Sequence, residues 1–178
     1  IRKGCAFVAD MLAFKGPWGR ATSLPPLGRW ALRVDPTDAP ALAPWGLLLP
    51  TAMLASTEKG GHAALHLAPD EWLLLSADAV PPAVPADPPH ALVDVSDRQL
   101  GVLLEGPGVR TLLAAGCPLD LDDRQAPPGF ATRTLFGKAE VLLWRRADAP
   151  DGASRFQLEA WRSFWPYVAA LLSDSAAG

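Results

Sequence analysis

Hydrophobic and polar residues alternate most regularly near the end of the chain. The alternation runs over residues 139–144 and again over 156–161, and a period of two residues is typical of a β-strand. The segment between them is polar and contains Pro150 and the pair Asp151-Gly152, which favours a turn. The pattern therefore predicts a β-hairpin.

The hydrophobic period changes at Ser163. Phe164, Val168 and Leu171 recur at helical spacing, the Ser163 hydroxyl could cap the first free N–H groups, and Pro166 is tolerated in a first helical turn. We expect a helix from Ser163 to about residue 172, packed over the apolar face of the hairpin.

Shorter patterns upstream predict further strands and one more helix. The expected strands are residues 30–34, 62–67, 72–76, 92–95 and 98–104, and the expected helix is 109–115, capped by Gly116. Residues 36–61 are rich in Pro, Ala and Gly, with at most a turn or two of helix around 42–47. Because the strands follow one another directly, the order argues for an α+β fold with antiparallel sheets.

Proline and glycine divide the chain into three predicted parts. Residues 1–29 contain Gly16-Pro17-Trp18-Gly19 and Leu24-Pro25-Pro26-Leu27, which disfavour long regular structure and predict an extended arm. The prolines of residues 77–90 suggest a boundary between a small α+β lobe over 30–90 and a strand–helix–hairpin–helix lobe over 91–178. We expect the two lobes to form one compact structural unit.

Composition narrows the class of protein. The net charge of −3 gives no electrostatic footprint for nucleic acid or an anionic membrane. Apolar runs are broken before the roughly 20 residues that a membrane span needs, and Asp10 and Lys15 interrupt the N-terminal segment, which argues against a signal peptide. Cys5 and Cys117 are the only cysteines, which favours free thiols and a cytoplasmic protein.

The titratable residues do not assemble into an active site. His62 and His66 are four residues apart in a predicted strand, where that spacing covers roughly 13 Å, too far for one metal ion. Asp94, Ser96 and Asp97 could form a catalytic group, but capping of a turn is favoured. Three further acidic residues, Asp120, Asp122 and Asp123, are expected to form a solvated acidic face.

Nucleophiles and phosphate loops are likewise not indicated. Cys117 follows the end of a predicted helix, where the helix dipole disfavours a thiolate. Cys5 has no histidine nearby in sequence, and no serine lies in a Gly-x-Ser-x-Gly elbow. Gly106-Pro-Gly108 is not followed by Gly-Lys-Ser/Thr.

Several blocks between about residues 62 and 172 resemble the gamma subunit of heterotetrameric sarcosine oxidase. They are Leu67-Ala-Pro-Asp-Glu-Trp-Leu-Leu-Leu75, Val93-Asp-Val-Ser-Asp-Arg98, Ala115-Gly-Cys-Pro-Leu-Asp-Leu121, Arg133-Thr-Leu-Phe-Gly-Lys-Ala-Glu-Val-Leu-Leu-Trp144 and Trp161-Arg-Ser-Phe164 followed by Tyr167-Val168. The resemblance implies two small α+β lobes with antiparallel sheets flanked by helices, similar to the first part of the glycine-cleavage T-protein and to the tRNA-modifying GTPase.

The resemblance also implies a role. The complex demethylates sarcosine oxidatively to glycine, passes the methyl carbon to tetrahydrofolate or releases formaldehyde, and reduces oxygen to hydrogen peroxide. FAD, covalent FMN, NAD and tetrahydrofolate are expected on the partner subunits and no cofactor or metal on this chain. The gamma chain is then an accessory subunit without catalytic residues, bound to the alpha, beta and delta subunits, and it could self-associate when isolated.

Two other functions remain open from the sequence. A stand-alone folate-binding protein of the T-protein superfamily would carry Lys-Gly-Cys-Tyr-x-Gly-Gln-Glu, whereas Lys3-Gly-Cys5 lies at the wrong end of this chain and lacks the rest of the motif. The other is an interaction protein for an unrelated partner, which would use the tryptophan-rich surface.

An accessory role predicts exposed aromatic residues at the partner surface. The candidates are Trp18, Trp45, Phe164 and Trp165. Three arginines in the matching blocks, Arg98, Arg133 and Arg162, are expected to pair with carboxylates such as Asp94 or Glu159, and Asp94, Ser96 and Ser163 to cap strand and helix ends.

Overall fold

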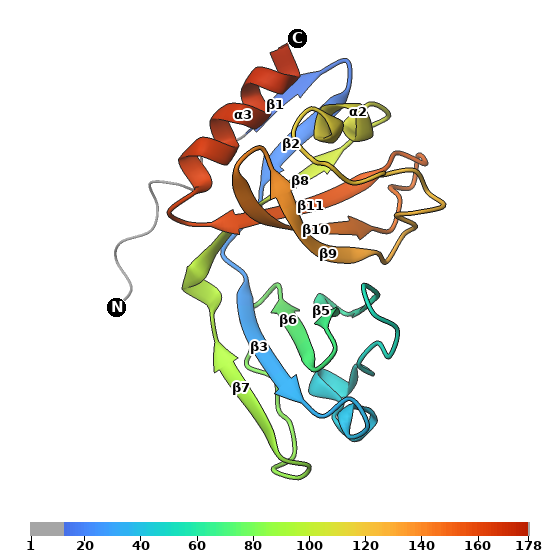
Figure 1. Ribbon diagram of the computed structural model, residues 1–178, viewed down its shortest axis with the longest axis vertical. Helices are drawn as coiled ribbons and strands as arrows, with labels where there is room; N and C mark the ends of the chain where they lie inside the picture. The colour runs from blue at the N-terminus through green and yellow to red at the C-terminus, as the bar shows by residue number, and fades with distance from the viewer. Residues whose placement is uncertain (1–12, 178) are drawn as a thin grey trace. The chain divides into compact units, whose positions relative to one another are not determined.

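Two compact units, each built on one sheet, make up the computed structural model, which describes residues 13–177 (Figure 1). Unit 1 comprises the described residues up to Pro25, residues 98–128 and the chain from Arg133 onward. Unit 2 comprises residues 26–97 and 129–132. This division differs from the expected bounds of 30–90 and 91–178, because residues before 26 join the C-terminal half and residues 90–94 pair with β3 of unit 2.

The sheet of unit 1 has six strands in the order β1-β2-β8-β11-β10-β9. Their bounds are β1 Ala13–Gly16, β2 Gly19–Ser23, β8 Gln99–Glu105, β9 Ala131–Phe136, β10 Ala139–Arg146 and β11 Arg155–Trp161. The predicted hairpin is confirmed, since β10 and β11 pair antiparallel from Val141 opposite Ala160 to Arg146 opposite Arg155. β11 pairs with β8 in the same sense.

The predicted extended arm is wrong for residues 13–23, which form a β-hairpin. Pro17 and Trp18 occupy the turn between β1 and β2, where the fixed φ of proline suits the first turn position. Gly19 takes a φ of +137°, which a side chain would disfavour. β2 then pairs with β8, with Ala21 opposite Leu104. Residues 1–12, including Cys5, lie outside the described residues.

Two α-helices complete the described part of unit 1. They are α2, Val109–Ala114, and α3, Trp165–Ala177. α3 contacts α2, β1 and β11, and its Val168 and Leu172 are buried, as are Leu104 and Phe156 of the sheet. α3 begins two residues later than predicted, because residues 162–164 form a turn whose Phe164 carbonyl accepts the first helical bond from the Val168 N–H.

Unit 2 has a five-stranded antiparallel sheet in the order β4-β5-β6-β3-β7. Its strands are β3 Gly28–Val34, β4 Ser56–Lys59, β5 His62–Ala68, β6 Glu71–Ser76 and β7 His90–Asp94. The four predicted strands of this part are therefore confirmed. β4 was not predicted, because its sequence Ser-Thr-Glu-Lys has no alternating apolar residues.

The core of unit 2 is closed by irregular segments and not by α-helices, so the expectation of flanking helices is wrong for this unit. Trp30 and Leu32 of β3 and Trp72 of β6 pack with Leu42 and Leu49 from the segment after β3. That segment contains only the short 3-10 helices η1, Ala39–Ala41, and η2, Pro44–Gly46. Its Pro and Gly content explains why no longer helix forms.

Candidate partner-binding surface

Two of the four tryptophan and phenylalanine residues expected at a partner surface are buried. Trp18 is 9% exposed and Trp165 only 2%, so the expected exposure of Trp18 is wrong and Trp165 is not among the exposed candidates. Trp18 turns inward because its ring meets Phe14 edge-on at 5.5 Å and its carbonyl accepts the N–H of Gly108. A Cβ on Gly108 would lie 2.7 Å from the Trp18 Cα, so the close approach depends on that glycine.

Trp45 is half-buried in unit 2 and is held by internal contacts. Its ring stacks on His62 at 4.5 Å and 7° and meets Trp30 edge-on at 5.7 Å. Its Nε1 donates to the carbonyl of Val80 at 3.1 Å. These contacts hold the indole within unit 2, so it is a poor candidate for a partner.

Phe164 is exposed, as predicted, and two aromatic residues that the sequence did not single out lie near it in the chain. Phe164 is 48% exposed, and Trp161 and Tyr167 are each 42% exposed. The three residues, called here the aromatic patch, mark the passage from β11 through the turn into α3 (Figure 1). The Phe164 N–H donates to the Trp161 carbonyl, which holds the turn together. Their spacing of three residues was the signal available in the sequence.

Two polar contacts fix parts of this patch. The guanidinium of Arg98 lies 5.4 Å from the centre of the Trp161 ring, a cation–π geometry. The Tyr167 hydroxyl accepts the backbone N–H of Lys138 at 3.1 Å. The patch is therefore ordered by the chain itself, which lowers the entropy lost when a partner binds.

The residues expected to cap turns differ in what they do. Asp94 Oδ1 accepts from the N–H of Ser96 at 2.9 Å and from its hydroxyl at 2.6 Å, and the Ser96 hydroxyl accepts the N–H of Arg29 at 2.9 Å. These contacts close a turn, as expected from the sequence. Ser163, by contrast, lies exposed in the turn before α3, so it does not occupy the cap position predicted for it.

The three arginines expected to pair with carboxylates are placed in unit 1. Arg98 contacts the Trp161 ring as described, and its carbonyl accepts the N–H of Arg162. Arg133 is exposed on β9, and Arg162 is exposed in the turn after β11. The cation–π contact of Arg98 is an interaction that the sequence did not predict.

The two histidines considered as metal ligands instead stack on tryptophans. His66 of β5 stacks on Trp72 at 4.3 Å and 12°, and His62 stacks on Trp45. The described residues contain no group of three or more His, Cys, Asp or Glu side chains that could hold a metal ion.

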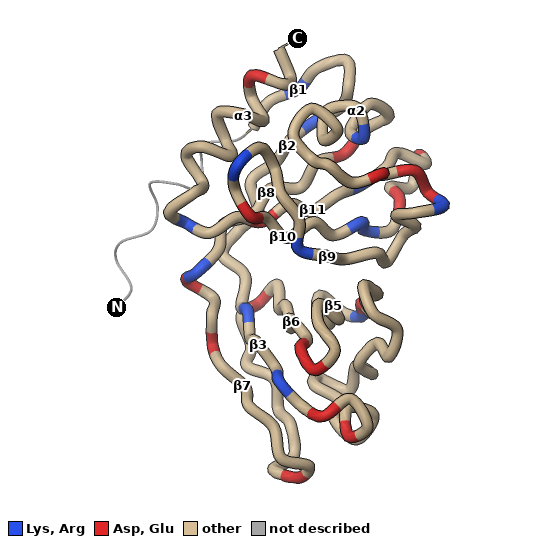
Figure 2. The backbone as a smooth tube through the Cα atoms, viewed as in Figure 1, with Lys and Arg blue, Asp and Glu red and all other residues tan. Residues whose placement is uncertain are grey.

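The acidic segment over residues 120–123 is paired with arginines. Asp123 forms ion pairs with Arg110 and Arg145. A hydrogen bond from the Arg124 side chain, followed by one from its backbone N–H, lowers the pKa of Asp122. Figure 2 shows acidic and basic residues following one another along the backbone between α2 and β9. The segment is thus exposed, as expected, but it is fixed by ion pairs.

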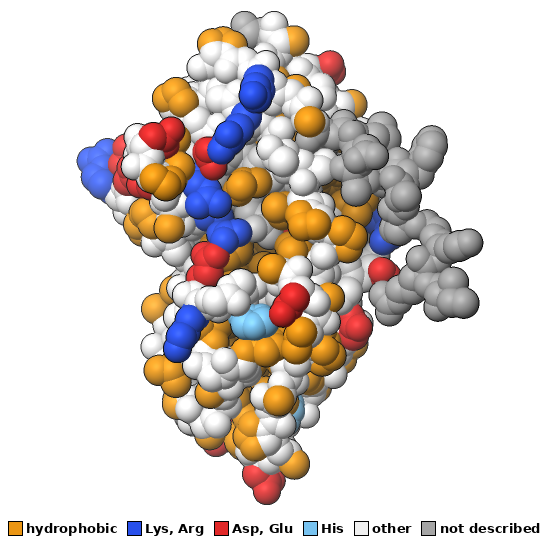
Figure 3. Space-filling model, turned by 180° about the vertical axis from the view of Figure 1, so that it is seen from behind, with side chains coloured by type: hydrophobic (Ala, Val, Ile, Leu, Met, Phe, Trp, Pro, Cys, Tyr) orange, Lys and Arg blue, Asp and Glu red, His pale blue; other side chains and the backbone are white. Residues whose placement is uncertain are grey.

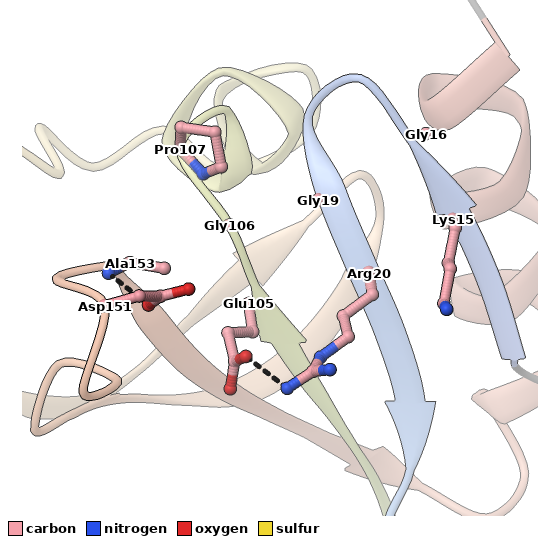
Figure 4. A pocket seen from close by; sticks show the side chains of 9 residues that line it. All are labelled: Lys15, Gly16, Gly19, Arg20, Glu105, Gly106, Pro107, Asp151 and Ala153. Carbon is pink, nitrogen blue, oxygen red and sulfur yellow. Dashed lines mark hydrogen bonds and ion pairs between the residues drawn. The ribbon is translucent and has the colours of Figure 1, made fainter.

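One pocket of about 310 Å³ opens on unit 1 (Figure 4). Lys15 and Arg20 of the first hairpin, Glu105 at the end of β8, and Asp151 in the turn after β10 supply its charges. Arg20 and Glu105 form an ion pair, and Asp151 Oδ1 accepts the N–H of Ala153 at 3.0 Å. Gly16, Gly19 and Gly106 line it without side chains. It combines both signs of charge.

Comparison with known proteins places these features in a family. The sequence profile of the sarcosine oxidase gamma subunit family matches residues 33–178. The chain belongs to this family. It is 32% identical over 129 residues to a sarcosine oxidase subunit gamma of Corynebacterium sp. (strain U-96), and the aligned region covers 68% of this chain and 62% of that relative. A second relative, from Corynebacterium sp. (strain P-1), is 31% identical over 93 residues, covering 49% of this chain and 46% of that protein.

A solved structure shares the fold. It is the heterotetrameric sarcosine oxidase from Corynebacterium sp. U-96 in complex with pyrrole 2-carboxylate, at a TM-score of 0.76 and 23% identity, over 96% of this chain and 91% of that one. The family membership expected from the sequence is thus confirmed, as is a fold with two antiparallel sheets. None of the described helices has the length and apolar character needed to cross a membrane.

Proposed function

We propose that this chain is the accessory gamma subunit of a heterotetrameric sarcosine oxidase. The observation that carries the proposal is the family match over residues 33–178. The aromatic patch of unit 1 supports it, because exposed aromatic side chains beside an ordered turn are typical of a surface that a partner covers.

In this proposal the chemistry takes place on the other subunits. The assembled enzyme oxidises sarcosine to glycine with oxygen, yields hydrogen peroxide, and passes the methyl carbon to tetrahydrofolate or releases it as formaldehyde. FAD, FMN, NAD and tetrahydrofolate bind to the partner subunits in the cytoplasm. The two lobes correspond to the first part of a T-protein-like fold, and this chain contributes contact surface and stability.

Co-expression with the alpha, beta and delta chains of the source organism tests the proposal. We expect a tagged version of this chain to retain a yellow complex that consumes oxygen when sarcosine is added. If the other chains form a fully active enzyme that does not bind this one, the proposal is wrong. Binding of an unrelated, colourless protein would support the alternative of a general interaction protein.

A pair of variants tests the contact surface. Phe164→Asp should weaken retention of the other subunits about tenfold or more, because a charge would have to be buried against an apolar partner. Met53→Asp is the matched control, since Met53 is 47% exposed but belongs to unit 2. Equal loss in both variants would argue against the patch.

A further inference from the structure

Five charged residues of unit 1 form a single row across five neighbouring strands. Lys15 of β1 lies opposite Arg20 of β2, Arg20 opposite Glu105 of β8, Glu105 opposite Arg155 of β11, and Arg155 opposite Arg146 of β10. Residues directly opposite one another point to the same face of a sheet. The five side chains, called here the charged row, therefore lie on one face.

The row is strongly cationic on a chain that is acidic. It holds four cationic side chains and one carboxylate, whereas the whole chain has a net charge of −3. Figure 3 shows a line of Lys and Arg side chains on the molecular surface, with acidic side chains beside it. Neighbouring strands are about 4.8 Å apart, so the row extends over about 19 Å.

The ion pairs of the charged row add little to the stability of the chain. Glu105 pairs with Arg20 and lies 3.3 Å from the Nε of Arg155, but partly exposed pairs stabilise a protein by only about 0–1 kcal/mol. Lys15 and Arg20 stand directly opposite each other, as do Arg155 and Arg146, and like charges in that position are destabilising. The row therefore carries more positive charge than its single carboxylate neutralises.

The two cationic side chains of the first hairpin are the accessible ones, whereas Arg146 lies over the Trp144 ring at 4.2 Å and donates to Gln157 Oε1 at 3.0 Å. Lys15 is exposed, and the side chain of Arg20 is 57% exposed, compared with 27% for Arg155. Within the described part of the chain, Lys15 has no acidic partner. In Figure 4 the side chains of Lys15, Arg20 and Glu105 extend from adjacent strands beside the pocket.

We propose that the charged row is the docking site for an extended acidic segment of another subunit. The inference rests on the proposed function, because it names a second surface, in addition to the aromatic patch, through which the chain would join the oxidase. A segment along the row would cover about six residues at roughly 3.3 Å each and direct about three side chains to it. Carboxylates at those positions would meet Lys15, Arg20 and the two arginines beyond Glu105.

The pocket beside the row gives one of these carboxylates a place to enter. Its walls include Lys15 and Arg20, which supply positive charge, and the backbone of Gly16 and Gly19. Nucleic acid fits the row less well, because its phosphates would also meet the acidic remainder of the chain.

Charge reversal at the exposed end of the row tests the inference. In Lys15→Glu/Arg20→Glu we expect the affinity for the co-expressed oxidase subunits to fall about tenfold or more and its dependence on salt to weaken. Lys59→Glu/Arg124→Glu is the control, because it removes one exposed Lys and one exposed Arg outside the row and changes the net charge equally. The control should change affinity by less than about threefold.

Arg20→Glu places a second carboxylate beside Glu105 and could unfold the hairpin. The neutral double variant Lys15→Gln/Arg20→Gln avoids this repulsion and tests the same contacts. The neutral pair should lose affinity with an unchanged circular dichroism spectrum. If the native chain binds the subunits and both row variants bind as tightly as the control, the charged row is not the docking site and the proposed function stands. If the native chain does not bind, the proposed function fails and the inference with it. If a single-stranded DNA 12-mer binds tightly to the native chain and not to the row variants, nucleic acid and not an acidic segment is the ligand of the charged row.

Discussion

The two units use their aromatic residues in different ways. In unit 2, Trp30, Trp45 and Trp72 contact one another or the rings of His62 and His66, and none of the three is among the exposed large hydrophobic residues. In unit 1, Trp18 and Trp165 are buried, while Trp161, Phe164 and Tyr167 are between 42% and 48% exposed.

This difference indicates that aromatic residues serve packing in unit 2 and remain available for binding in unit 1. Unit 2 lacks α-helices to cover its sheet, so large rings close its core over segments of Pro, Ala and Gly. The described part of unit 1 has two helices for that purpose, and aromatic and charged side chains remain on its surface. Changes to rings of unit 2 should therefore affect folding, and changes to the aromatic patch should affect binding.

The largest effect is expected for Trp72→Ala in unit 2. Trp72 is 1% exposed, stacks on His66, and donates from Nε1 to the Pro50 carbonyl at 2.9 Å. Its removal leaves a cavity and an unpaired carbonyl, so the free energy of unfolding should fall by about 3–5 kcal/mol in urea denaturation. Trp161→Ala in unit 1 should cost less than about 1 kcal/mol. Equal losses would contradict the comparison.

A smaller difference in stability is expected between alanine substitutions at two serines, one in each unit. Ser96→Ala removes the acceptor of the Arg29 N–H and a donor to Asp94, and Arg29 is only 2% exposed. The free energy of unfolding should fall by about 1 kcal/mol. Ser163→Ala removes an exposed hydroxyl from the turn before α3 and should stay within about 0.5 kcal/mol. A larger cost at Ser163 would restore the capping role expected from the sequence.

These serines also show what local sequence can predict. In Asp94-Val-Ser-Asp97, the contacts between Asp94 and Ser96 are local and are the ones that these residue types favour, whereas the contact with Arg29 is not local. The β10–β11 hairpin was likewise predictable, because alternation and turn residues lie within one segment. At Ser163 the sequence predicted the helix start two residues too early, since α3 begins at Trp165, which is buried.

The features that could not be predicted depend on residues far apart in the chain. Trp18 is buried because Gly108 approaches it closely, and those residues are 90 positions apart. The prolines near Trp18 suggested an arm, although Pro17 fits the turn of a hairpin that β8 extends into a sheet. The charged row combines β1, β2, β8, β10 and β11, so it becomes visible only once the strand order and register are known.

The smallest expected effect concerns the pKa values of two exposed carboxyl groups. A hydrogen bond from the Ser76 hydroxyl lowers the pKa of Asp78 in unit 2 from its ordinary 3.8, helped by the N–H of Val80. In unit 1, the Arg124 side chain does the same for Asp122. Each carboxylate therefore stabilises the fold above the pKa of the unfolded chain, and this contribution is lost as the pH falls through the lower folded value.

The two carboxyl groups should respond differently to salt and to mutation. Carbon-13 NMR titration should show the Asp78 pKa rising toward its ordinary value in Ser76→Ala, because the buried hydroxyl is its main hydrogen-bond donor. The Asp122 pKa should rise in Arg124→Gln, and also in native protein at about 1 M salt, since an exposed ion pair is screened. Salt should move Asp78 less, because its partner is uncharged. Equal salt shifts at both residues would show that the pKa of Asp78 also depends on a charged neighbour. The surface carboxyl groups of the two units would then not differ in what lowers their pKa values.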